Sequence, residues 1–252
     1  ARRTGKGLAA TMSKVFPHAA ASAAQTGSLL PVKAVMIDLD GTLLDTAGDL
    51  AAAANSMLRE LGRAELPHVT IQSYIGKGIQ KLVKRTLTGS LDGEPDAVLF
   101  AKAMPIYERE YANTLCVSTH PYPGVVEGLN ALRETGFRLA CITNKAEAFT
   151  LPLLRGTGLL DYFELVLSGD SLPKKKPDPL PLLHACKHFG ILPHEMLLIG
   201  DSLNDAEAAR AAGCHVFCVP YGYNEGRDVR ELNCDAIVTS IHAADRLICK
   251  PS

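Results

Sequence analysis

The feature that most constrains the fold is an apolar run that ends in two aspartates. Ala34-Val35-Met36-Ile37 is followed at once by Asp38-Leu39-Asp40-Gly41-Thr42. The apolar residues predict a short buried strand, and the residues after them predict a turn at its carboxyl end. Gly41 lets the backbone turn there without a Cβ clash. A chain of this kind is expected to build a sheet whose strand ends carry the chemistry.

The two carboxylates suit covalent phosphoryl transfer. Asp38 can attack phosphorus, because carboxylates form aspartyl-phosphate intermediates. Asp40 lies on the same side of an extended segment, so it can give a proton to the departing oxygen and take one from water. Gly41 and the hydroxyl of Thr42 complete the turn that would face the phosphate. The alternative is an acidic strand end that merely caps a turn.

Two later strands also end in residues that suit phosphate. Arg138-Leu139-Ala140-Cys141-Ile142 is followed by Thr143-Asn144-Lys145, which supplies a hydroxyl, an amide and a cation in a row. Phe163-Glu164-Leu165-Val166-Leu167 predicts another strand, and the loop after it carries Lys174-Lys175-Lys176-Pro177. A lysine binds phosphate as a point charge. On its own, however, a lysine run is typical of a solvated surface.

A fourth strand brings two further carboxylates. Met196-Leu197-Leu198-Ile199 leads into Gly200-Asp201-Ser202-Leu203-Asn204-Asp205. Ser202 and Asp205 are spaced as a capping box for a helix, which accounts for them without any catalytic role. That interpretation leaves Asp201 at a strand end without an explanation.

The order Asp, Thr, Lys, Asp, each after its own apolar strand, resembles the haloacid dehalogenase superfamily of phosphotransferases. The resemblance implies a doubly wound, mostly parallel, Rossmann-like α/β sheet in which the strand ending in Asp38 neighbours the strand ending in Asp201. Ligands of such sheets bind where the strand order reverses. Two adjacent carboxylates would repel each other unless a cation joined them, and oxygen ligands favour Mg²⁺.

Between the first and second motifs lies a long helical segment. Thr46-Ala47-Gly48-Asp49 predicts a capping box that opens a helix ending near Gly62, and further helical patterns run from Ile71 to Leu87 and from Pro95 to Leu115. We therefore predict a helical cap at residues 46–118 inserted into an α/β core of residues 32–45 and 119–252. A strand-to-helix connection of this size is typical of a lid that excludes water.

One cation of the cap is a candidate for substrate contact. Lys77 lies between Gly76 and Gly78, in a turn that can approach a ligand closely. The alternative places Lys77 on a solvated basic face together with Lys81, Lys84 and Arg85.

The resemblance narrows to the bacterial phosphoglycolate phosphatases over about residues 31–250. It rests on the inserted cap and on five further stretches, which are Ile75-Gly76-Lys77-Gly78, Pro121-Tyr122-Pro123-Gly124, Thr143-Asn144-Lys145, Lys176-Pro177-Asp178-Pro179-Leu180-Pro181-Leu182 and Val219-Pro220-Tyr221-Gly222-Tyr223-Asn224. It implies Mg²⁺-dependent hydrolysis of 2-phosphoglycolate to glycolate and phosphate.

The same resemblance implies a role for each motif residue. Asp38 is the nucleophile and a metal ligand, Asp40 is the general acid and base and binds the metal through its backbone carbonyl, and Asp201 is the remaining protein ligand. Phosphate would be held by Thr143, Asn144 and Lys176. Asp205 would support the metal shell or Lys176, and Lys174 and Lys175 are left as surface or salt-bridging residues.

Three other functions stay open at this point. A broader phosphatase could act on nucleotides, sugar phosphates or pyrophosphate. A β-phosphoglucomutase-like mutase would carry an arginine in the cap turn, where this chain has Lys77. A catalytically silent phosphate-binding protein would most simply lack Asp38 or Asp40, and both are present.

Composition agrees with a metabolic enzyme. Apolar residues make up 47 % of the 252-residue chain, and the net charge of −1 gives no reason to expect nucleic-acid or membrane binding. The expected partner is a small phosphorylated metabolite, whereas the oligomeric state cannot be read from the sequence. Seven cysteines without a C-x-x-C pair favour buried thiols in a reducing, cytoplasmic compartment.

The first 31 residues differ from the rest. They are rich in Ala and Ser, carry Arg2, Arg3, Lys6 and Lys14, and precede the first acidic residue, Asp38. We expect a mobile leader that is an extension at the start site or a remnant of expression, since Met12 can be an internal start. The alternatives are a transit peptide or a twin-arginine export signal.

Overall fold

The computed structural model describes residues 29–251. Residues 1–28, which make up most of the predicted leader, lie outside them. The strands are β1 (Leu30–Pro31), β2 (Ala34–Ile37), β3 (Leu44–Asp45), β4 (His120–Pro121), β5 (Arg138–Ile142), β6 (Leu165–Leu167), β7 (Met196–Gly200), β8 (His215–Cys218), β9 (Ala236–Ile237) and β10 (Ile248–Cys249).

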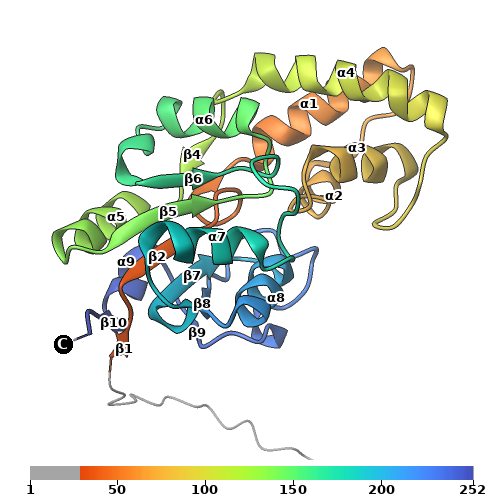
Figure 1. Ribbon diagram of the computed structural model, residues 1–252. Helices are drawn as coiled ribbons and strands as arrows, with labels where there is room; N and C mark the ends of the chain where they lie inside the picture. The colour runs from red at the N-terminus through yellow and green to blue at the C-terminus, as the bar shows by residue number, and fades with distance from the viewer. Residues whose placement is uncertain (1–28, 252) are drawn as a thin grey trace, which may run out of the picture.

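Helices of two kinds connect the strands (Figure 1). The α-helices are α1 (Ala47–Glu60), α2 (His68–Gln72), α3 (Ile79–Thr88), α4 (Ala97–Thr114), α5 (Val125–Glu134), α6 (Glu147–Gly156), α7 (Leu180–Phe189), α8 (Leu203–Ala212) and α9 (Ile241–Asp245). Short 3-10 helices lie at Leu160–Tyr162, Pro193–Glu195 and Val229–Glu231. No helix between residues 29 and 251 is both long and apolar enough to cross a bilayer.

A parallel sheet forms the centre of the molecule, with strand order β6-β5-β2-β7-β8-β9. The chain order reverses at β2, which has β5 on one side and β7 on the other. This is the predicted doubly wound α/β topology, and it sets the strand ending before Asp38 beside the strand ending before Asp201.

Alternate strand residues pack against two different helical layers. Val35 and Ile37 face a cluster that includes α5 and α9, whereas Ala34 and Met36 face a cluster that includes α7 and α8. Because both faces of the sheet are covered, its strands are apolar throughout rather than alternating. The sheet is therefore a rigid three-layer support for the loops at its carboxyl edge.

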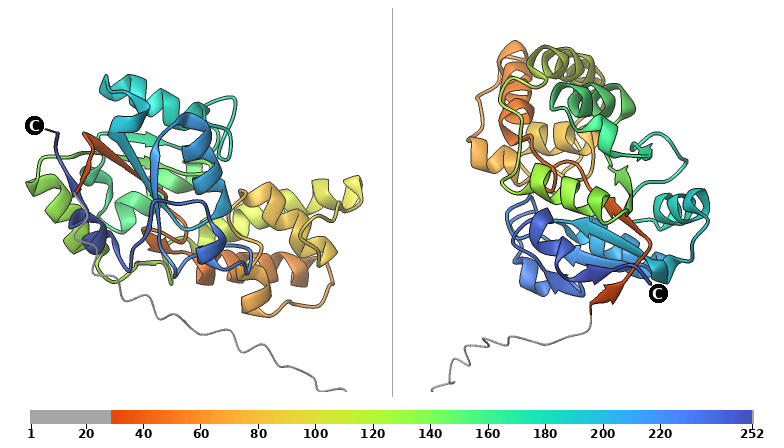
Figure 2. Two further views of the ribbon diagram at one scale, coloured as in Figure 1. Left: turned by 90° about the horizontal axis from the view of Figure 1, so that it is seen from below. Right: turned by 90° about the vertical axis from the view of Figure 1, so that its left-hand side faces the viewer.

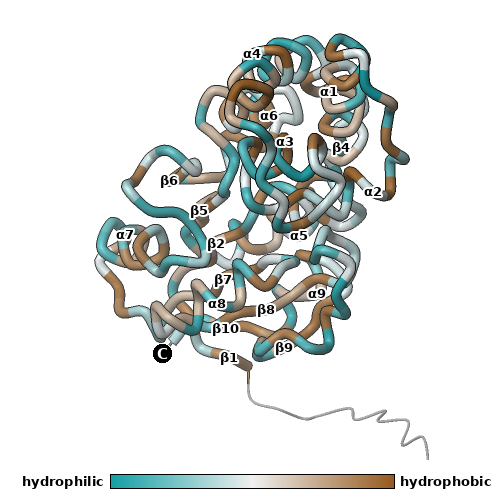
Figure 3. The backbone as a smooth tube through the Cα atoms, turned by 90° about the vertical axis from the view of Figure 1, so that its right-hand side faces the viewer, coloured by the Kyte–Doolittle hydropathy of each residue, from teal (hydrophilic) through white to brown (hydrophobic). Residues whose placement is uncertain are grey.

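Helices α1 to α4, which we call the cap, form a separate cluster at one end of the sheet (Figure 2). The chain enters the cap after β3 and leaves it before β4, and these two strands pair in an antiparallel ribbon, Leu44 with Pro121 and Asp45 with His120. Hydrophobic and hydrophilic stretches alternate along α1 and α4, as amphipathic helices require (Figure 3). The exact domain boundaries stay a prediction.

Two local predictions were wrong. Thr46 and Asp49 do not form a capping box, because the Thr46 hydroxyl donates to Asp40 and the Asp49 carboxylate accepts four hydrogen bonds from Ser118 and Thr119. The pattern from Ile71 to Leu87 is not one helix, since α2 ends at Gln72 and a turn containing Gly76 and Gly78 precedes α3. Both glycines have positive φ, which a continuous helix does not allow.

Candidate active site

Three predicted site residues meet at the carboxyl edge of the sheet. Asp38 follows β2, Thr143 follows β5 and Asp201 follows β7, and the register aligns Ile37 with both Cys141 and Ile199. A pocket enclosing about 530 Å³ of unfilled space, its mouth included, lies over this edge. Its lining comprises Asp38, Asp40, Leu50, Ile75, Gly76, Gly78, Ile79, Leu82, Thr143, Asn144, Lys145, Lys176, Asp201, Ser202, Asn204 and Asp205.

Lys176 lies between two carboxylates beneath this pocket. Its Nζ is 2.9 Å from Asp38 Oδ1 and 2.6 Å from Asp205 Oδ1, and it also donates to the carbonyl of Ile142. Its side chain is only 2 % exposed. Burial alone would lower the pKa of Lys176, but the charges of Asp205 and Asp38 outweigh it and raise that pKa. The lysine therefore stays charged and holds the Asp38 carboxylate in place.

Burial acts on the two neighbouring carboxylates in the opposite sense. It raises the pKa of Asp38 to about 7, against the lowering effect of Lys176. The pKa of Asp201 is raised well above its usual range, first by burial and then by the charges of Asp205 and Asp38. Asp38, Asp201 and Asp205 lie together around a single lysine, Lys176. Ionising all three carboxylates would therefore need a further positive charge.

The site fits a divalent cation. Oxygens of Asp38, Asp201 and Asp205 lie within 4.8 Å of one another. Asp205 accepts three hydrogen bonds, one at Oδ1 from Lys176 and two at Oδ2 from the N–H and hydroxyl of Ser202. Each Asp201 oxygen accepts one hydrogen bond, and Asp38 Oδ1 pairs with Lys176, so Asp38 and Asp201 keep more lone pairs for a metal. An all-oxygen donor set is the one that hard divalent ions prefer.

Gly41 and Thr42 shape the wall beside Asp201. Gly41 has φ +87°, and a Cβ there would collide with the Asp201 carboxylate, so only glycine fits. The Thr42 hydroxyl lies 3.2 Å from Asp201 Oδ1, and the backbone N–H of Tyr223 donates to Oδ2 at 2.5 Å.

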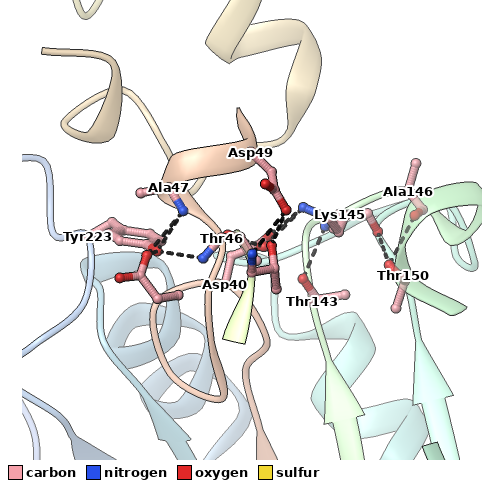
Figure 4. A network of polar contacts seen from close by, with 11 residues as sticks. Asp40, Thr46, Ala47, Asp49, Thr143, Lys145, Ala146, Thr150 and Tyr223 are labelled. Atoms are coloured by element: carbon pink, nitrogen blue, oxygen red, sulfur yellow. Dashed lines mark hydrogen bonds and ion pairs between the residues drawn. The ribbon is translucent and has the colours of Figure 1, made fainter. Parts of the chain in front are cut away.

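Two residues that sequence reasoning did not assign to Asp40 hold its carboxylate (Figure 4). Thr46 Oγ1 donates to Asp40 Oδ1 at 2.7 Å, and Lys145 Nζ lies 3.0 and 3.1 Å from the two Asp40 oxygens. Lys145 is buried, and its ammonium lies 4.9 Å from the Tyr111 ring centroid. Lys145 could have been predicted, because it stands in the Thr143-Asn144-Lys145 run that follows β5. Thr46 could not, because its spacing from Asp49 indicated a helix cap instead.

Tyr223 lies in a stretch that carries the family resemblance, but sequence reasoning gave it no role, because its partners lie far away in sequence. Its hydroxyl donates to Asp45 Oδ1 at 2.6 Å and accepts from the N–H groups of Thr46 and Ala47 at 2.9 and 3.0 Å. Together with the bond to Asp201, these contacts join the acidic edge of the core to the start of the cap (Figure 4).

Thr143 and Asn144, the two candidates for phosphate binding after β5, differ in how many of their side-chain hydrogen-bond donors are already used. Thr143 lines the pocket, and its hydroxyl accepts a hydrogen bond from the Lys145 N–H at 3.2 Å. Both amide hydrogens of Asn144 are used, on the carbonyls of Gly76 and Lys176 at 3.1 and 2.9 Å. Its Oδ1 is buried without a partner and can only accept. The Asn144 side chain therefore holds the cap turn against the core.

The cations of the cap do not share one solvated face. Arg85 is 1 % exposed and pairs with Glu225, so its placement on such a face was wrong. Lys81 and Lys84 do pair with Glu94 at the surface. Lys77 is 41 % exposed, lies 3.4 Å from Glu225 and is absent from the pocket lining.

The other two lysines of the Lys174-Lys175-Lys176 run lie outside the pocket, as expected. Lys174 pairs with Asp178 at the surface, and Lys175 donates to the carbonyl of Lys77 at 3.1 Å. Only the lysine before Pro177 is buried.

Comparisons with known proteins agree with this geometry. A family model of haloacid dehalogenase-like hydrolases matches residues 35–219. Phosphoglycolate phosphatases of Nitrosospira multiformis and Thiobacillus denitrificans are 76 % and 62 % identical, each match covering 88 % of this chain and 98 % and 97 % of the relative. The crystal structure of a predicted phosphoglycolate phosphatase from Haemophilus somnus aligns with a TM-score of 0.79 at 33 % identity, over 84 % of this chain and 95 % of that one. The chain belongs to the haloacid dehalogenase-like hydrolases.

Proposed function

We propose that this protein is an Mg²⁺-dependent phosphomonoester hydrolase whose substrate is 2-phosphoglycolate. The observation that carries the proposal is the buried Asp38 carboxylate, held by Lys176 at the strand edge with Asp40 held separately by Lys145 and Thr46. One carboxylate is thus presented as a nucleophile and the other as a proton carrier. The relatives named phosphoglycolate phosphatase support the choice of substrate.

The chemistry proceeds in two displacements at phosphorus. Asp38 Oδ attacks, the bond from phosphorus to the ester oxygen breaks, and Asp40 gives its proton to the departing glycolate oxygen. Asp40, now ionised, takes a proton from water as that water attacks the same phosphorus. The acyl-phosphate bond then breaks and returns Asp38 as a carboxylate with free phosphate.

Mg²⁺ would be held by the carboxylates of Asp38 and Asp201 and by the backbone carbonyl of Asp40. When bound, it would neutralise charge on the phosphate oxygens. Asp205 supports this arrangement indirectly, because its two oxygens fix Lys176 and Ser202.

The phosphate itself would be bound by the Thr143 hydroxyl, by Lys176 and by the loop at Gly41 and Thr42. Asn144 is proposed to contribute through its position, since its side-chain hydrogens hold the cap turn. Lys77 is proposed to meet the substrate carboxylate, which requires it to leave Glu225.

A broader phosphatase is the second candidate. The cap contributes Leu50, Ile75, Gly76, Gly78, Ile79 and Leu82 to the pocket lining, and none of these is charged. A lining of this kind selects by size and shape rather than by a second anionic group.

A location in the cytoplasm fits the seven free cysteines, and the expected partner is a small phosphorylated metabolite.

Initial rates against a panel of phosphate esters test the proposal. With Mg²⁺ present, kcat/KM should be highest for 2-phosphoglycolate among sugar phosphates, nucleotides, pyrophosphate and an aryl phosphate. The Asp38→Asn protein is the control for contaminating phosphatases. Equal rates across the panel would favour the broader phosphatase, and no hydrolysis of any ester would reject the function.

A further inference from the structure

Glu225 joins the core to the cap through two cations. Its Oε1 lies 2.6 Å from Nη2 of Arg85 and 3.4 Å from Nζ of Lys77. Across residues 29–251, no other ion pair connects the cap to the core. Burial would raise the pKa of Glu225, but the hydrogen bond and charge of Arg85, with the charge of Lys77, lower it, so the carboxylate is ionised at neutral pH.

Arg85 links Glu225 to the turn that covers the pocket. Its Nη1 donates to the carbonyl of Tyr74 at 2.9 Å, and its Nε donates to the carbonyl of Leu91 at 2.9 Å. The guanidinium uses a different nitrogen for each of the three contacts, so it reaches groups that lie too far apart for the single nitrogen of a lysine. The turn of residues 74–78 is therefore fixed to α3 and, through Glu225, to the core.

The remaining hydrogen bonds between this turn and the core are accepted by backbone carbonyls of the turn. Asn144 and Asn204 both donate to the carbonyl of Gly76, at 3.1 and 3.3 Å, and Lys175 donates to the carbonyl of Lys77. Beside them runs a groove lined by Val69, Gln72 and Ser73 on the cap and, on the core, by Asp201 and most residues between 219 and 229. Along this groove polar contacts hold the seam closed, whereas elsewhere Tyr111 of the cap packs against Phe149 of the core, with ring centroids 4.9 Å apart.

The backbone of Glu225 supports a role for its side chain. Its φ is +51°, a left-handed conformation that residues other than Gly, Asn and Asp seldom adopt. A glycine or asparagine would occupy this position with less strain. The residue present is instead one long enough to reach Arg85.

We propose that Glu225 is a positioning residue that latches the cap over the pocket through Arg85. We call this pair the latch (Glu225 and Arg85). The inference depends on the proposed function only because turnover of a phosphate ester is one of its readouts. A latch of this kind acts on every substrate alike, whereas a specificity residue acts on one.

Two variants of Glu225 test the latch, with a matched control. Glu225→Gln removes the charge and keeps the size of the side chain. Glu225→Asn is too short to reach Arg85 but accepts the left-handed backbone, which offsets part of the cost of leaving the buried Arg85 unpaired. Asp228→Asn is the control, because Asp228 lies on the same loop and pairs only with the exposed Arg230.

Both Glu225 variants should lose about tenfold in kcat/KM for 2-phosphoglycolate and for an aryl phosphate, the scale of one hydrogen bond between charged groups. Asp228→Asn should keep the wild-type values. Hydrogen exchange in peptides covering residues 74–78 should be faster in both Glu225 variants and unchanged in the control, while exchange in β2 and β7 stays the same. The thermal unfolding temperature of both Glu225 variants should fall, because the buried Arg85 loses its partner, so kinetics and exchange are measured well below the unfolding transition of each variant.

Two results would overturn the latch. Unchanged kinetics and exchange in Glu225→Gln would show that the carboxylate does not hold the cap. Exchange that rises in β2 and β7 as much as in residues 74–78, together with the loss of activity, would assign Glu225 to the folding of the whole protein. If the wild type hydrolyses no phosphate ester, the proposed function fails, and the exchange measurement still decides the latch.

Discussion

Lys176 in the core and Arg85 in the cap are both buried cations, and they serve different ends. Lys176 lies in the core between Asp38 and Asp205, directly beneath the pocket. Arg85 lies in the cap, pairs with Glu225 across the seam and does not line the pocket. Removing one partner of a buried ion pair leaves the other charge uncompensated, which is costly in both places. Lys176 fixes the reacting carboxylate of Asp38, whereas Arg85 and Glu225 fix the cap over the pocket. Substitutions in the two regions should therefore change kcat and kcat/KM to different extents.

The largest effect should come from the nucleophile in the core. Asp38→Asn removes the attacking oxygen, and we expect kcat to fall by roughly 10⁴–10⁶-fold, the scale seen when a covalent nucleophile is lost. The loss should be the same for 2-phosphoglycolate and an aryl phosphate. Substantial turnover by the purified variant on either ester would assign the nucleophile elsewhere.

Metal dependence should separate the two carboxylates that share the acidic edge with Asp38. Asp201→Asn removes a proposed ligand, whereas Asp205→Asn weakens the support of Lys176 and Ser202. For Asp205→Asn we expect about a 10–100-fold higher Mg²⁺ requirement, as for other outer-shell changes, and for Asp201→Asn a larger increase. Titration of activity with Mg²⁺ measures both, and the reverse order would exchange their roles. Wild-type activity that persists in excess chelator would reject the metal.

Lys77 should have a smaller and selective effect. If it meets the substrate carboxylate, Lys77→Ala should lower kcat/KM for 2-phosphoglycolate by roughly 10–100-fold, the equivalent of about 1.5–3 kcal/mol for a bond to a charged group. Hydrolysis of an aryl phosphate should change little. Lys81→Ala is the matched control, because Lys81 pairs with Glu94 at the cap surface. Parallel losses on both esters would instead give Lys77 a role in closure.

The smallest effect concerns stability against pH. Burial raises the pKa of Asp38 to about 7, so its protonated form is favoured in the folded state. Its contribution is therefore fully present below the unfolded pKa and is lost as pH rises through about 7. In chelator, the unfolding temperature of the wild type should fall between pH 5 and 8 relative to that of Asp38→Asn, by a few degrees. An identical pH dependence in both proteins would show that Asp38 titrates normally.

The core could be predicted from sequence far better than the cap. Asp38, Thr143 and Asp201 each follow an apolar strand directly, and parallel strands bring their carboxyl ends to one edge, so strand order alone places them together. The fold class and family followed from the same pattern. Nothing comparable links Arg85 to Glu225, which lie 140 residues apart, so helical spacing placed that arginine on the wrong face.

The spacing of residues along the chain also gave a wrong prediction where a side chain hydrogen-bonds a residue outside its own helix. Thr46 and Asp49 have the spacing of a capping box, but Asp40 takes the Thr46 hydroxyl and the chain at residues 118–119 takes the Asp49 carboxylate. Tyr223 lies in a stretch that carries the family resemblance, but its role could not be predicted, because its hydroxyl contacts Asp45, Thr46 and Ala47, which lie 176 to 178 residues away. Pairings of this kind follow from the fold rather than from any local pattern.

Trapping the phosphorylated enzyme is the most direct test of the central claim that Asp38 attacks phosphorus and Asp40 moves the protons. In Asp40→Asn, an aryl phosphate should still transfer its phosphoryl group, because its acidic leaving group needs little protonation, whereas hydrolysis of the intermediate lacks its base. Acid quenching and peptide mass analysis should then find one phosphoryl group on the peptide that contains Asp38, and none in the Asp38→Asn, Asp40→Asn double variant. Release of the aryl alcohol by Asp40→Asn without any phosphoryl group on that peptide would contradict the account.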